Sequence, residues 1–119
     1  MVDQSHHFEK EYSILRAELV KMVSLVSDSM EMSSKAFENL DRSLAKKILE
    51  LDDEIDNLDR EIEDLVYNII ARFNPLGKDL RYVITAMKFA TNLERIGDHA
   101  CNFAEKIIWV AENVPDFKS

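Results

Sequence analysis

Apolar side chains recur at alternating intervals of four and three residues through three long segments of this chain, and only two short stretches interrupt them. Residues at this spacing share one face of an α-helix. The chain also has only two glycines and two prolines in 119 residues, which is too few for the many tight turns of a β-rich fold. We therefore predict an all-α protein made of a few long helices.

The predicted helices cover about residues 5–37, 42–73 and 79–113, and each is roughly 45 Å long. The second carries the most regular apolar series, of the kind that lets helices interlock at a shallow angle: Leu44, Ile48, Leu51, Ile55, Leu58, Ile62, Leu65 and Ile69. The third carries two adjoining apolar series, so it should contact two neighbours. Short connections make successive helices antiparallel, which predicts an up-down-up three-helix bundle in one domain over residues 1–119.

Two short stretches separate the predicted helices. The first, Glu38–Asp41, ends in an aspartate whose carboxylate can accept a hydrogen bond from a free N–H group at the start of the second helix. The second, Asn74–Lys78, combines a proline with a glycine and ends the second helix. Asp79 follows directly, and we expect it to cap the third helix.

Composition excludes several classes of protein. Fifteen basic against 23 acidic residues give a net charge of −8, which opposes binding to the phosphates of nucleic acids. The single cysteine, Cys101, excludes an internal disulfide framework and fits a reducing cytosol. No uncharged apolar run approaches the roughly 18–20 residues of a membrane-spanning helix, and the first residues lack a signal-peptide pattern. We expect a cytoplasmic protein without direct membrane insertion.

Glu94 breaks the apolar series of the third helix. Burying a carboxylate without a partner costs several kcal/mol or forces its protonation, so a cation, an arginine or solvent should compensate. Asp98 and Asn102 follow at intervals of four residues and place further oxygen ligands on the same face. Gly97 lies beside them, and its missing side chain leaves room for an ion, a water molecule or a closely packed helix.

The second helix offers a comparable pair in Asp52 and Asp56, again four residues apart. The stretch Glu38–Asp64 contains eleven acidic and four basic residues, and like charges one turn apart disfavour a helix. A cation would relieve this repulsion. Carboxylate and amide oxygens suit hard ions such as Mg²⁺, Mn²⁺, Ca²⁺ or iron.

A purely structural interpretation remains open from the residues alone. An acidic stripe is commonly a solvated helix face, and arginines such as Arg95 or Arg81 would satisfy Glu94 and Asp98. His99 follows Glu94 by five residues, which does not match the Glu-x-x-His spacing of di-iron bundles. We find no pattern for a catalytic nucleophile, since the serines of the first helix have no evident base partner and Cys101 lies in the apolar series.

Four stretches resemble the PhoU family. The first, HHFEKEYSILRAELVKM (6–22), is similar to the opening of the family's domain. The signature of that family's third helix is similar to the run NLERIGDHACNFAEKI (92–107). Its proline turn and the helix that follows are similar to NPLGKDLRYVITAMKFATNLERIGD (74–98). Its second helix is similar to KKILELDDEIDNLDREIE (46–63). The resemblance covers nearly the whole chain and implies a three-helix bundle. Family members typically carry two such bundles, so this chain resembles the first half of one, or a one-bundle protein that pairs with itself.

The resemblance also implies a metal site. PhoU-like proteins carry E(D)-x-x-x-D motifs that bind iron or other metals, and these correspond here to Glu94 with Asp98 and to Asp52 with Asp56, with Asn102 as a further ligand. Iron, zinc, manganese and magnesium are the candidate ions.

The function implied by the resemblance is that of a phosphate-specific transport system accessory protein. Such a protein is a non-enzymatic adaptor that negatively regulates phosphate uptake and the phosphate regulon. Its implied partners are a sensor histidine kinase and the ATPase of a phosphate ABC transporter, and it works in the cytoplasm, at the membrane through these partners, as a homodimer or higher oligomer. The alternatives are a metal-binding bundle with an interaction role only, and a metal-dependent phosphoesterase.

Overall fold

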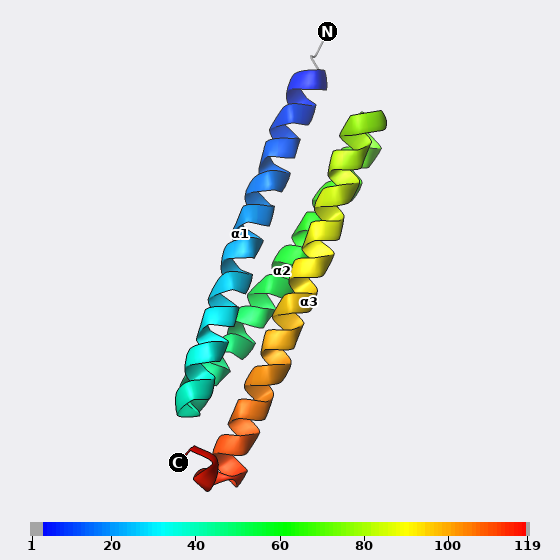
Figure 1. Ribbon diagram of the computed structural model, residues 1–119. Coiled ribbons are helices and arrows are strands. Elements are labelled where there is room, and N and C mark those ends of the chain that lie inside the picture. Colours follow the sequence, from blue (N-terminus) through cyan, green and yellow to red (C-terminus); the bar gives the residue numbers. More distant parts are fainter. Residues whose placement is uncertain (1–3, 119) are drawn as a thin grey trace.

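The computed structural model describes residues 4–118, and they form three long helices that lie side by side in a rod of 70 × 17 × 17 Å (Figure 1). The helices are α1 (Gln4–Asn39), α2 (Arg42–Phe73) and α3 (Gly77–Asn113), and the short 3-10 helix η1 (Pro115–Lys118) follows α3. α1 and α3 run in the same direction and α2 runs against both. The predicted all-α, up-down-up three-helix bundle is therefore confirmed. None of these helices is apolar over a stretch long enough to cross a lipid bilayer.

The turn between α1 and α2 is built as the sequence predicts. Asp41 has an extended backbone and its Oδ1 accepts a hydrogen bond of 3.0 Å from the backbone N–H of Leu44. The N–H of Asp41 donates in turn to the carbonyl of Ala36 at 2.9 Å, which closes the last turn of α1. The bounds predicted for α2 are the observed ones, whereas α1 is two residues longer at its end than expected.

The prediction that Asp79 caps the third helix is wrong. α3 begins at Gly77, two residues earlier, with Leu76 in the capping position and no side-chain hydrogen bond there. The backbone N–H of Asp79 already donates to the carbonyl of Leu76 at 3.2 Å, so Asp79 is part of the first helical turn. Its carboxylate instead complements the positive end of the helix dipole.

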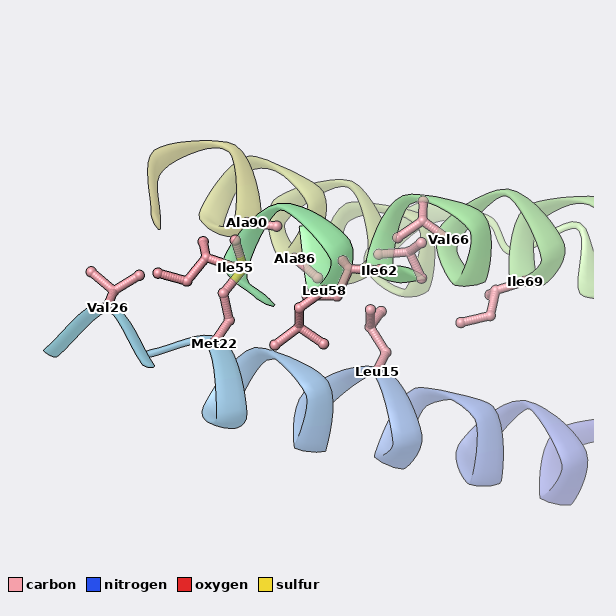
Figure 2. Packing of buried hydrophobic residues seen from close by; sticks show 11 residues of the cluster. Leu15, Met22, Val26, Ile55, Leu58, Ile62, Val66, Ile69, Ala86 and Ala90 are labelled. Atoms are coloured by element: carbon pink, nitrogen blue, oxygen red, sulfur yellow. The ribbon is translucent and has the colours of Figure 1, made fainter. Parts of the chain in front are cut away.

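The larger part of the core lies toward the end of the bundle where α2 meets α3. Figure 2 shows leucine, methionine and valine side chains of α1 pointing toward the isoleucines of α2, with the small alanines of α3 between the helices. The buried members are Leu15, Met22, Val26, Ile55, Leu58, Ile62, Val66, Ile69, Val83, Ala86 and Ala90.

A second, smaller cluster fills the other end of the bundle, with Ala36, Ala45, Ile48, Ala100, Ala104 and Ile107 as its buried members. Between the two clusters, each helix contributes polar or side-chain-free residues to the interior: Ser29 and Ser33 on α1, Asp52 on α2, and Gly97 on α3. We call these four residues the polar layer. It interrupts the apolar core at the level of the residues singled out as metal ligands.

Candidate functional site

Three aspartates converge beside the polar layer, in the groove between α2 and α3. Asp52 and Asp56 come from successive turns of α2, and Asp98 comes from α3. One carboxylate oxygen of each lies within 4.8 Å of the others. We call Asp52, Asp56 and Asp98 the carboxylate triad. Asp52 is buried, Asp56 is half-buried and Asp98 is exposed, so the triad leads from the core to the surface.

Asp52 is the member that most needs a partner. Its side chain belongs to the core and is only 8% exposed, yet its Oδ1 accepts no hydrogen bond. A buried carboxylate oxygen without a donor is strongly unfavourable as an anion. Burial, followed by the charges of Asp56 and Asp98, raises the pKa of Asp52 to about 6. Hydrogen bonding with the Cys101 thiol lowers this pKa in part. The carboxylate therefore favours a proton or a cation.

Gly97 lets α3 approach Asp52 closely. A Cβ atom at position 97 would lie 3.4 Å from Oδ1 of Asp52 and 3.3 Å from Cδ1 of Ile55. The sequence suggested that Gly97 leaves room for an ion, a water molecule or a closely packed helix. The structure shows the closely packed helix, because the backbone of α3 lies directly against α2 at this point. The side chain of Asp52 is thereby held under α3 and near Asp98.

Glu94 extends the triad along α3. The structure places it half-buried at the edge of the groove, whereas the sequence pattern suggested a core position. Burial raises the pKa of Glu94 to about 7, together with a hydrogen bond to Asp98 and the charges of Asp98, Asp56 and Asp59. The raised pKa favours the protonated form of this carboxyl, which can donate a hydrogen bond to Asp98.

Two aspartates in this acidic region also have raised pKa values. Burial, and then the charge of Asp98, raises the pKa of Asp56. Burial, and then the charge of Glu63, raises the pKa of Asp59. Arg60 partly counteracts both shifts, and it also donates a hydrogen bond to Asn57. One arginine at the edge does not balance this many acids.

The arginines named as alternative partners do not pair with these acids. Among residues 4–118, the ion pairs join Lys35 with Glu31, Arg42 with Glu112, and Arg72 with Glu11. Neither Arg95 nor Arg81 takes part in them. The interpretation in which the chain's own arginines satisfy Glu94 and Asp98 therefore receives no support from the described side chains.

The remaining polar candidates belong to α1 and α3. Asn102, expected as a ligand, is exposed one turn beyond Asp98 on α3. Burial, and then the charge of Asp52, raises the pKa of Cys101 to about 12, which keeps this thiol protonated and a poor nucleophile. His99 is exposed on another face of α3. Ser33 donates to the carbonyl of Ser29 at 2.8 Å.

The sequence pattern underestimated the burial of Asp52. The core series of α2 was assigned through Leu44, Leu51 and Leu65, which are only half-buried in the structure. The buried residues of α2 recur at intervals of three or four: Ala45, Ile48, Asp52, Ile55, Leu58, Ile62, Val66 and Ile69. An aspartate in that series was the signal that would have identified the buried carboxylate.

The donor set fits a hard cation. The triad supplies three carboxylates, Glu94 lies beside it, and the unsatisfied Oδ1 of Asp52 lacks a positive partner. Oxygen ligands of this kind hold Mg²⁺, Mn²⁺, Ca²⁺ or iron. A bound cation would offset the repulsion that raises these pKa values.

Comparisons with known proteins identify the family of this chain. Residues 19–107 match the family model described as "PhoU domain". A relative from Thermotoga maritima, named phosphate-specific transport system accessory protein PhoU homolog 1, is 48% identical over 99% of this chain and 50% of its own length. A PhoU homolog with the same accessory-protein name from Clostridium acetobutylicum is 38% identical over 84% of this chain and 46% of its own.

A third relative, the PhoU homolog from Pseudomonas aeruginosa, is 34% identical over 91% of this chain and 45% of its own length. No solved structure matches the chain. The chain spans about half the length of the curated relatives it matches. Since the family model covers most of the bundle, including both acidic motifs, the chain belongs to the PhoU family.

Proposed function

We propose that this chain acts as an accessory, regulatory component of phosphate-specific transport. It is a non-enzymatic adaptor that restrains phosphate uptake and the phosphate regulon. The support comes from its relatives, which are named phosphate-specific transport system accessory proteins. The observation that carries the proposal is the carboxylate triad, because it forms an acidic patch that opens on one side of a rigid bundle.

The proposed partners follow from the family. They are a sensor histidine kinase and the ATPase of a phosphate ABC transporter, and the chain relays the state of the transporter to the kinase. It works on the cytoplasmic side of the membrane through these proteins, and it forms a homodimer or higher oligomer. An acidic groove suits a partner surface that presents lysine or arginine, and such contacts weaken as salt increases.

We further propose that the groove holds a metal cation such as iron, Mn²⁺, Mg²⁺ or Zn²⁺. Asp52, Asp56 and Asp98 are its ligands, with Glu94 and Asn102 as additional donors. When bound, the cation supplies positive charge at the centre of the patch. Asp52 then anchors the ion to the core, while the exposed Asp98 presents it to a partner.

A purely structural role is the second candidate. It is favoured by the raised pKa of Glu94, since a protonated glutamate bonded to Asp98 relieves part of the repulsion without an ion. The melting temperature distinguishes a groove that binds cations from a purely structural one. Added Mn²⁺ or Fe²⁺ raises the melting temperature if the groove binds cations, and leaves it unchanged if protons alone satisfy the acids.

Binding to a purified sensor histidine kinase tests the regulatory proposal. The variant Glu94→Ala with Asp98→Ala should bind at least about tenfold more weakly. The matched control is Glu31→Ala with Glu38→Ala, which removes two exposed acids of α1 that lie away from the groove. Equal binding by the first variant and the unmodified chain would contradict a role for this patch.

A further inference from the structure

A hollow of about 340 Å³ lies between α1 and α3, whereas the acidic groove lies between α2 and α3. The sizes of the side chains create it. Tyr82, Ala86 and Phe89 follow one another at intervals of four and three residues and share one face of α3, so the small Ala86 leaves a gap between two aromatic rings. Leu15 and Leu19 of α1 line the other side of this gap. The hollow is therefore built on two helices and not on a loop.

The base of the hollow is apolar and its mouth is polar. Leu15 is fully buried and Ala86 is only 6% exposed, and both belong to the larger core cluster (Figure 2). Arg16 and Thr85 also line the hollow, and both are exposed. A ligand that fits this arrangement has an apolar body and one polar end.

Aromatic rings form the sides of the hollow. The rings of Tyr12 and Tyr82 lie 5.8 Å apart, and Phe89 follows Tyr82 by seven residues on α3. Tyr82 is 44% exposed and Phe89 is 57% exposed, so much of each ring remains in contact with water. An apolar body between these rings would remove part of that surface from water, which favours binding.

The charge at the hollow is positive, although the whole chain carries a net charge of −8. Among the described residues that line the hollow, Arg16 is the only charged one. The ion pairs described for residues 4–118 do not involve Arg16. Arg81 and Lys88 are exposed four residues before and three residues after Thr85, so they lie on the same side of α3. The polar end of a ligand bound here should therefore be an anion.

We propose that this hollow binds a small carboxylate with an apolar chain, such as a medium-chain fatty acid. The carboxylate pairs with Arg16 at the mouth, and the chain lies against Leu15, Leu19 and Ala86 between the aromatic rings. An apolar cavity of about 150 Å³ holds benzene, so a hollow of about 340 Å³ has room for roughly eight to twelve carbon atoms. This site goes beyond the proposed function, since it involves neither the acidic groove nor a partner protein.

The length of the hollow favours one small molecule over a larger partner. Its lining residues lie within positions 12–19 of α1 and 82–89 of α3. Seven residue steps of an α-helix span roughly 10 Å. An interface with another protein extends over a much larger surface, so the hollow suits a single short chain with its charged end at the mouth.

Calorimetric titration of the 119-residue chain with octanoate tests the charged end of the site. The unmodified chain should bind octanoate with a Kd on the order of 0.1–1 mM. Arg16→Gln should weaken octanoate binding by about three- to tenfold and leave the binding of uncharged 1-octanol unchanged. Lys21→Gln is the matched control, because Lys21 is an exposed cation of α1 that faces α2 residues instead. It should bind octanoate as the unmodified chain does.

Filling the gap tests the apolar part of the site. Ala86→Leu should weaken the binding of both octanoate and 1-octanol by about tenfold or more, since leucine occupies the space between the rings. If circular dichroism shows that this variant does not fold, Phe89→Ser at an exposed position should weaken both ligands instead. In NMR spectra, octanoate should shift the methyl signals of Leu15 and Leu19 but not those of Ile107 in the other core cluster.

Several results would overturn the proposal. Absence of octanoate binding up to about 5 mM removes it, and so does equal octanoate binding by Arg16→Gln and the unmodified chain. Equally tight binding of octyltrimethylammonium contradicts the choice of an anion. Binding to vesicles of anionic phospholipid without binding of octanoate means that a bilayer covers the hollow. A dimer that excludes octanoate means that a second copy of the chain covers it.

Discussion

At the scale of single residues, the buried Asp52 should make stability depend on pH. Its pKa is about 6 in the folded bundle against 3.8 for an ordinary aspartate. The folded state therefore binds the proton more tightly, so the stability contributed by protonated Asp52 is fully present below pH 3.8 and is lost as pH rises through about 6. Without metal, we expect Asp52→Asn to reduce the loss of unfolding free energy across this window by on the order of 1–2 kcal/mol.

Urea unfolding at a series of pH values, in the presence of a chelator, measures this dependence. The neighbouring Asp53→Asn is the control, because Asp53 is exposed and its removal should leave most of the slope unchanged. An identical slope in Asp52→Asn and the unmodified chain would show that Asp52 does not carry the effect. Glu94, whose pKa is raised to about 7, adds a further loss of stability at slightly higher pH.

Gly97 should matter more for cation binding than for stability. Alanine gains about 1 kcal/mol in helix propensity over glycine. The added Cβ would meet Ile55 at 3.3 Å and Asp52 at 3.4 Å, so α3 or these side chains must shift. We expect Gly97→Ala to unfold within about 1 kcal/mol of the unmodified chain. Its rise in melting temperature with Mn²⁺ should be clearly smaller, and an equal rise would contradict this account.

At the scale of the elements, the two aspartates at helix starts should differ in their effects on stability. Asp41 accepts a hydrogen bond from Leu44 at 3.0 Å, whereas Asp79 lies inside the first turn of α3 and caps nothing. Asp41→Ala should therefore cost about 1 kcal/mol of unfolding free energy. Asp79→Ala should cost about 0.5 kcal/mol or less, through the helix dipole alone. Equal losses in urea denaturation would refute the distinction.

The helices themselves were predictable because local rules determine them. The four–three spacing, the aspartate before α2 and the proline–glycine stretch after it give the bounds of α2 as observed. The start of α3 was not predictable in the same way. A helix can begin without a side-chain cap when a glycine with positive φ makes the entry turn, and Gly77 has φ of +55°.

The residues of the candidate site were predictable from the sequence, but the burial of each side chain was less so. Motif spacing identifies Asp52, Asp56, Glu94 and Asp98, but it does not say which acid faces the interior. That depends on how far each helix rotates about its own axis, which packing between helices decides. The structure buries Asp52 and leaves Glu94 at the groove edge, the reverse of the order that the apolar series suggested.

At the scale of the whole molecule, the polar layer divides an otherwise continuous core. Ser29, Ser33, Asp52 and Gly97 stand between the two apolar clusters. An aspartate there reduces stability in the absence of a cation, and natural proteins accept such costs at functional positions. A cation bound in the groove as proposed would therefore raise the stability of the bundle.

Replacing Asp52 by leucine should show how this carboxylate affects the stability of the bundle with and without a cation. Leucine has nearly the same branched shape, so it fills the layer and joins the two clusters without enlarging the core. At pH 8 in chelator, we expect Asp52→Leu to increase the unfolding free energy by about 1–4 kcal/mol, since an unpaired buried charge is exchanged for apolar contacts. The same variant should lose its stabilisation by Mn²⁺, because the anchoring ligand is gone.

The comparison with Asp56→Leu makes this test specific. Asp56 is only half-buried, so leucine there gains little from burial, while its loss still removes one member of the triad. Both variants should stop responding to Mn²⁺, but only Asp52→Leu should unfold at markedly higher urea concentration. If Asp52→Leu is less stable than the unmodified chain in chelator, the Asp52 carboxylate already has a favourable partner inside the bundle. The groove would then not need a cation to complete it.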